Sequence, residues 1–61
     1  MSSVESIMFQ LTSGLISETA IPTSYLQIPE IVDALIKYNW SLRASNIPGW
    51  TNAFRIINYS S

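Results

Sequence analysis

The sequence lacks two chemically useful residue types, because none of its 61 residues is cysteine or histidine. Disulfide bonds are therefore excluded, and a structural zinc site would have to be built from carboxylates alone. Catalysis near neutral pH usually relies on a histidine, or on a nucleophile with a base beside it, and no imidazole is present to activate the serines and threonines. We expect a non-catalytic protein without a metal, a cofactor or a small-molecule substrate.

Charge is also scarce, since 11% of the residues are charged against about 25% in an ordinary soluble domain. Three basic residues cannot form the basic face that phosphate neutralisation requires, so nucleic acid is not an expected partner. The acidic residues all precede the basic ones, a separation that could pair two halves of one chain, align copies head to tail, match a partner of mixed sign, or arise by chance. In chain order they are Glu5, Glu18, Glu30 and Asp33, then Lys37, Arg43 and Arg55.

Long apolar runs are absent as well. The longest uncharged stretch, residues 6–17, has twelve residues, and a membrane span needs about 18 or more. No basic residue precedes the first apolar run, where Glu5 stands instead, so no signal peptide is expected and synthesis in the cytosol is the default. We predict no membrane span, and docking beside an integral membrane protein remains an alternative.

What is present is a helical spacing of apolar residues near the start of the chain, which predicts a first amphipathic helix over about residues 3–19. Ser2 and Glu5 fit a capping box that would mark its beginning. Gly14 is either a break in this helix or a place of close backbone packing, and packing is the preferred interpretation. The predicted apolar face consists of Val4, Ile7, Met8, Leu11 and Leu15.

A second amphipathic helix is predicted over about residues 29–44. Pro29 suits the first position of a helix, because its missing N–H needs no partner there. An apolar, proline-containing connector joins the two helices and should lie against them, and the Pro48-Gly49 pair signals the turn that follows. The apolar arc of this helix is wider than the stripe of a surface helix, and its main row is Ile31, Leu35, Tyr38 and Leu42.

The last segment, about residues 51–59, is ambiguous between a short helix and an extended strand. A helix would align Phe54 and Ile57 on one side, whereas a strand would show no clean alternation, so a helix is favoured. The sequence thus predicts an all-α fold in one small domain, residues 1–61, with two amphipathic helices and a short C-terminal element.

These patterns also predict a function. A chain of this size buries only about 60% of the surface that its unfolded form exposes, so broad apolar arcs should be covered by another protein or copy. We expect a structural or accessory subunit of a larger assembly, such as a particle, a filament or a multi-subunit complex. The alternative is a small self-folding binding module or inhibitor that presents an aromatic patch to one target. The predicted interface residues are Ile31, Leu35, Tyr38, Trp40, Leu42, Trp50 and Phe54.

Overall fold

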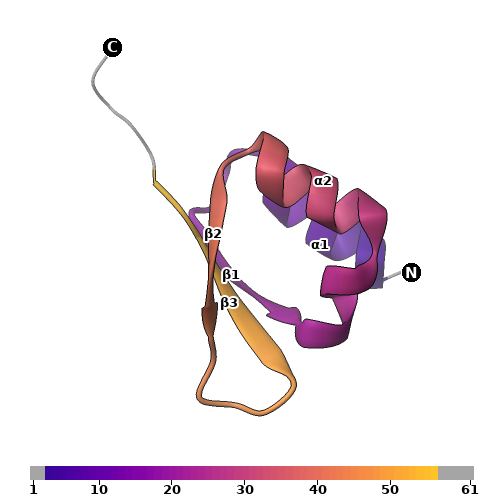
Figure 1. Cartoon of the computed structure of the whole chain (residues 1–61). Coiled ribbons are helices and arrows are strands. Elements are labelled where there is room, and N and C mark those ends of the chain that lie inside the picture. The colour runs from indigo at the N-terminus through magenta and orange to yellow at the C-terminus, as the bar shows by residue number, and fades with distance from the viewer. Residues whose placement is uncertain (1–2, 57–61) are drawn as a thin grey trace.

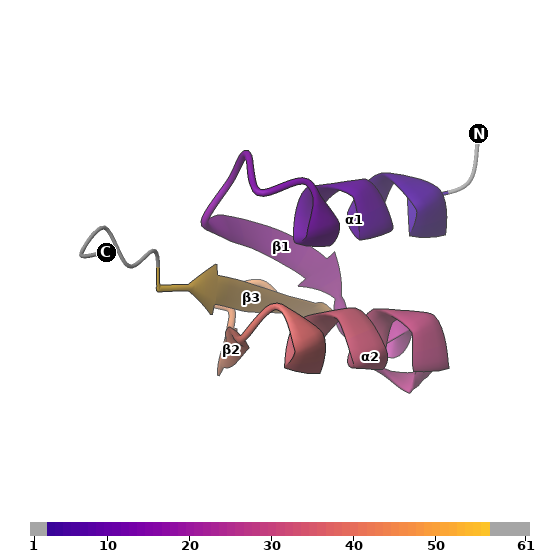
Figure 2. The ribbon, with the colours of Figure 1, turned by 90° about the horizontal axis from the view of Figure 1, so that it is seen from above.

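The computed structural model describes residues 3–56, which form one layer of helices on one layer of sheet (Figure 1). In Figure 1 the sheet is seen nearly edge-on with both helices on the same side. Viewed from above, α1 lies on the β1 side and α2 on the β2 side (Figure 2). The elements in chain order are α1 (Ser3–Thr12), β1 (Glu18–Pro22), the 3₁₀ helix η1 (Thr23–Gln27), α2 (Pro29–Lys37), β2 (Trp40–Ala44) and β3 (Trp50–Arg55).

The prediction of an all-α fold is therefore wrong. Residues 18–22, within the end of the first predicted helix and the connector, form β1, and residues 40–44, at the end of the second, form β2. The ambiguous C-terminal segment is extended as β3 over residues 50–55, so the favoured helix is wrong there. Residues 57–59 of that segment lie outside the described residues, as does Ser2 of the predicted capping box.

The first helix stops seven residues short of its predicted end because of Gly14. Its backbone adopts φ +79°, a left-handed conformation that glycine takes without steric cost. A Cβ placed on Gly14 would meet nothing within 4 Å. The interpretation as close packing is therefore wrong, and Gly14 allows the left-handed backbone that breaks the helix. Leu15, predicted on the apolar face, follows the break and is exposed.

The second helix begins at Pro29 as predicted and ends because of Asn39. Asparagine is one of the few non-glycine residues that accept a left-handed backbone after a helix, and Asn39 has φ 60°. Its N–H donates to the Ile36 oxygen (3.2 Å), which closes the last turn. The chain then leaves in an extended direction, so that Trp40 opens a strand.

The predicted turn at Pro48-Gly49 is present, but it joins two strands. Gly49 has φ +86°, and the Trp50 N–H donates to the Ile47 oxygen (3.2 Å), as in a type II turn with proline second and glycine third. The Gly49 oxygen also accepts from the Thr23 N–H (2.8 Å), which ties the turn to the end of β1.

The sheet is antiparallel with strand order β1-β3-β2, so the last strand in the chain lies in the centre. Its register aligns Ile21 with Thr51 on one side and Leu42 with Ala53 on the other. Side chains alternate between the two faces of a strand. The buried Ile21, Thr51 and Ala53 therefore define an inner face toward the helices, and the residues between them define an outer face.

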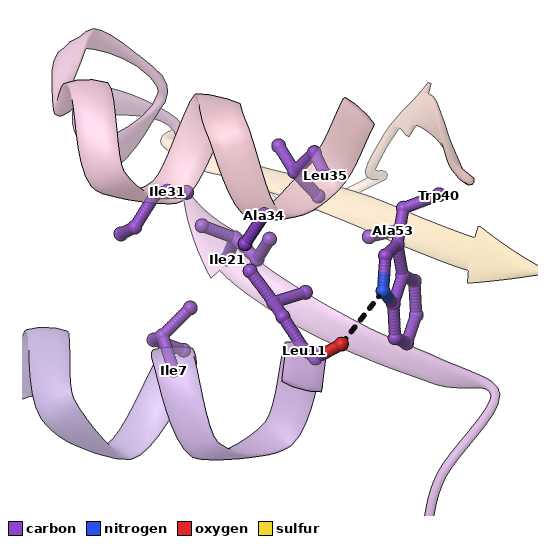
Figure 3. Close-up of a cluster of buried hydrophobic side chains, with 8 residues drawn as sticks. All are labelled: Ile7, Leu11, Ile21, Ile31, Ala34, Leu35, Trp40 and Ala53. Carbon is purple, nitrogen blue, oxygen red and sulfur yellow. Dashed lines mark hydrogen bonds between the residues drawn. The ribbon is translucent and has the colours of Figure 1, made fainter. Parts of the chain in front are cut away.

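The core fills the space between the helices and the inner face (Figure 3). Trp40 closes one end, where its indole Nε1 donates to the main-chain oxygen of Leu11 (3.1 Å). The guanidinium of Arg55 lies over the Trp40 ring at 5.2 Å and also donates to the Ile16 oxygen (3.2 Å). The buried residues are Ile7, Leu11, Ile21, Ile31, Ala34, Leu35, Trp40 and Ala53.

Candidate interaction surface

The outer face of the sheet is the surface that the fold leaves open, because both helices lie on the other side (Figure 1). Strand alternation and register place residues from all three strands on it. They are Glu18, Ala20 and Pro22 of β1, Trp50, Asn52 and Phe54 of β3, and Ser41 and Arg43 of β2.

Two aromatic side chains dominate this outer face. Trp50 is 42% exposed and pairs in register with Pro22 at one end of the sheet. Phe54 is half-buried at the other end, and the Arg43 guanidinium lies over its ring at 5.3 Å from the centroid. Such a cation–π contact contributes roughly 0.5–1 kcal/mol at an exposed site. It also holds the cation of Arg43 on the outer face rather than beyond the edge of β2.

A shallow hollow of about 240 Å³ lies beside Phe54 and is lined by Glu18, Thr19, Ala20 and Asn52 as well. Pockets for drug-sized ligands usually measure about 300–1,000 Å³ and enclose most of the ligand. This hollow is smaller and open. Its one titratable group is Glu18, and the Thr19 hydroxyl in the lining is bonded to Gln10, so the hollow suits a protruding side chain better than a reaction.

Two further open hollows lie elsewhere on the surface. One of about 300 Å³ runs from α1 over the edge of β1 to Trp50. The other, of about 280 Å³, lies between the two helices beside Met8 and Lys37. Within residues 3–56 no three acidic side chains gather in a way that could hold a metal ion.

The seven predicted interface residues are distributed between the core and the surface. Ile31, Leu35 and Trp40 are buried in the chain's own core, and Tyr38 is half-buried against it. Leu42 is 47% exposed at the edge strand β2. Only Trp50 and Phe54 lie on the outer face, at its opposite ends. Their role in binding a partner stays a prediction.

Sequence reasoning missed the neighbours of Trp50 and Phe54, namely Ala20, Arg43 and Asn52. These residues share a face only because three strands pair, and no strand was predicted between residues 18 and 44. The available signals were Gly14 and Asn39, since both residue types favour the left-handed backbone that ends a helix.

No family model, curated protein or solved structure matches this chain. A functional conclusion therefore depends on the residues and geometry described above. Neither of the two α-helices in residues 3–56 has the length and apolar character that crossing a membrane requires.

Proposed function

We propose that this protein is a non-catalytic structural or accessory subunit that joins a larger protein assembly through the outer face of its sheet. The observation that supports this proposal is the open outer face itself, which carries Trp50, 42% exposed, and the half-buried Phe54. The function is unchanged from the sequence-based expectation, but the contact surface moves from the helices to the sheet.

The chemistry of the outer face suits a protein partner. Tryptophan, tyrosine and arginine are enriched among residues that contribute most to binding at interfaces, because they bury large areas and keep a polar contact. Trp50 and Arg43 supply two of these types on one face. Neighbouring Ser41 and Asn52 are neutral, so a partner could cover them without the desolvation cost of burying a charge.

A self-folding binding module with one target is the second candidate, and the closed core favours it. Leu11, Ile21, Ile31 and Ala53 are fully buried within the chain. Every buried side-chain polar atom among the described residues has a hydrogen-bond partner. The core is thus complete without a second protein, and a monomer could fold before binding.

The test compares the wild type with Trp50→Ser and with Phe9→Ser as a matched control. Phe9 is also an exposed aromatic residue, at 62% exposure, but it belongs to α1 and not to the outer face. The tagged full chain is purified gently from the cells that make it, and its size is measured by native gel filtration. We expect wild type and Phe9→Ser in a large complex and Trp50→Ser released from it, with unchanged circular dichroism.

Two outcomes would change the proposal. A one-to-one complex with a single target would favour the binding module. Retention of Trp50→Ser in the large complex would contradict the role of the outer face.

A further inference from the structure

The two edges of the sheet differ in how their main-chain groups are arranged. The Thr23 N–H donates to the Gly49 oxygen and the Arg55 N–H donates to the Ser17 oxygen, each at 2.8 Å. In antiparallel strands, hydrogen-bonded residue pairs alternate with non-bonded pairs. The odd-numbered residues of β3 therefore bond to β1, and its even-numbered residues bond to β2.

This alternation fixes which groups of β2 are free. In the register with β3, Ser41 and Arg43 are the residues that bond to it. Trp40, Leu42 and Ala44 direct their N–H and C=O groups away from β3, toward the open edge. Their side chains belong to the inner face, and Leu42 and Ala44 are exposed there because the helices do not cover this strand fully.

The edge of β1 is protected and the edge of β2 is not. At β1 the outward-directed residues are Glu18, Ala20 and Pro22, and proline has no N–H to offer an added strand. At β2 the outward-directed residues include neither a proline nor a charge. An unprotected edge of this kind pairs readily with another strand.

We propose that β2 pairs with β2 of a second copy, in antiparallel orientation about a twofold axis at Leu42, to form a continuous six-stranded sheet. In this register Leu42 lies opposite Leu42 of the second copy, and Trp40 lies opposite Ala44. Arg43 lies opposite the neutral Ser41. All five residues of the strand find partners, and apolar side chains meet on the inner face.

Charge selects this register over its neighbour. A twofold axis at Arg43 would place two guanidinium groups directly opposite each other, which is destabilising. An axis at Ser41 would pair Arg43 with Asn39, whose φ of 60° is not extended. The strand is therefore complementary to itself in one register, as a closed symmetric dimer requires. A second copy of the chain would be one of the partners in the assembly proposed above, so this inference rests on the proposed function.

The experiment is sedimentation equilibrium of the full chain over a dilution series, for wild type, Leu42→Pro and Ala20→Pro. Each substitution removes an N–H that points away from β3, so the sheet of one chain keeps its hydrogen bonds. We expect a dimer for wild type and Ala20→Pro. Leu42→Pro should raise the dissociation constant about tenfold or more, because the two interchain hydrogen bonds donated by the two Leu42 N–H groups are lost.

A second readout does not depend on proline being tolerated. Facing residues of a hydrogen-bonded antiparallel pair have Cα atoms about 5.5 Å apart, within the range of a disulfide. The chain has no cysteine, so Leu42→Cys can be compared cleanly with Ala20→Cys. Mild oxidation at low concentration should link Leu42→Cys chains in pairs and leave Ala20→Cys chains single.

A wild type that stays monomeric throughout, or a dimer that survives Leu42→Pro and fails to link Leu42→Cys, would overturn the β2 dimer. Neither result would contradict the proposed role of Trp50, because Trp50 lies on the outer face and not at the edge of β2. Conversely, a dimer that forms normally in Trp50→Ser while the larger complex is lost would support both proposals separately.

Discussion

The inner and outer faces of the sheet each carry one of the two tryptophans, and their surroundings differ. Trp40 on the inner face is 8% exposed, with its Nε1 bonded to Leu11 and a guanidinium over its ring. Trp50 on the outer face is 42% exposed and is not part of the buried core. The helices cover only the inner face of the sheet. The same residue type is therefore part of the core on the inner face and is accessible to a partner on the outer face.

This difference shows that apolar content alone does not identify an interface. Burial of a tryptophan, isoleucine or leucine stabilises the chain only where the fold covers it. Among the described residues, the exposed large apolar side chains are Phe9, Leu15, Ile36, Leu42, Ile47, Trp50 and Ile56. Substitutions at covered positions should change stability, and substitutions at uncovered positions should change association.

The largest effect is expected on α2, which has a covered and an uncovered isoleucine. Ile31 is fully buried and Ile36 is 71% exposed. Ile31→Ala should lower the free energy of unfolding by about 2–5 kcal/mol, because it removes buried methyl groups and leaves a cavity. Ile36→Ala should change it by less than about 0.5 kcal/mol. Urea denaturation followed by circular dichroism measures both free energies of unfolding. Equal losses in the two variants would contradict the expected difference between covered and uncovered positions.

A smaller difference is expected between the two tryptophans. Trp40→Phe removes the donor to the buried Leu11 oxygen and should cost about 1–3 kcal/mol of unfolding free energy. Trp50→Phe should be close to neutral for stability. Each variant keeps one tryptophan, so acrylamide quenching adds a check. The emission of Trp40 should be shielded in Trp50→Phe, and the emission of Trp50 should be quenched in Trp40→Phe.

The smallest effect concerns the turn that sets which face Trp50 occupies. Gly49→Ala places a Cβ at φ +86° without any clash, so the cost is conformational and about 1–2 kcal/mol. Gly49→Asn should cost less, because asparagine tolerates this conformation better. Thermal unfolding midpoints rank the two variants. If alanine were as stable as glycine at this position, the left-handed turn would not be a constraint on the register.

Part of this fold was predictable from the sequence. Pro29 correctly marked the start of α2, and helical spacing correctly grouped Ile7 with Leu11 and Ile31 with Leu35, which are all buried. These positions lie in segments with a clear helical spacing, and in α2 Pro29 at the first helical position agrees with it.

The strands were missed because short apolar segments fit both the 3.6-residue repeat of a helix and the two-residue repeat of a strand. The row from Ile31 through Leu42 continues at helical spacing, yet after Asn39 a strand also places Trp40 and Leu42 on one face. The left-handed backbone of Asn39 ends the helix, and the residues after it form a strand. Trp50 and Phe54 were both predicted as interface residues, and the strand places them on one face because they are four residues apart; their role in binding stays a prediction. Their neighbours depend on pairing between residues 18 and 54, which no local pattern reveals.

The central position of β3 governs the order in which the chain can fold. β1 and β2 do not pair with each other, so neither has a strand neighbour until residues 50–55 are in place. The β2–β3 hairpin closes across a five-residue loop, whereas docking β1 joins residues as far apart as 18 and 54. Closing the longer loop loses more chain entropy and is the slower kind of step. We therefore expect the β2–β3 hairpin to form first and β1 to dock last, so that the rate-limiting step of folding is the pairing of β1 with an already formed hairpin.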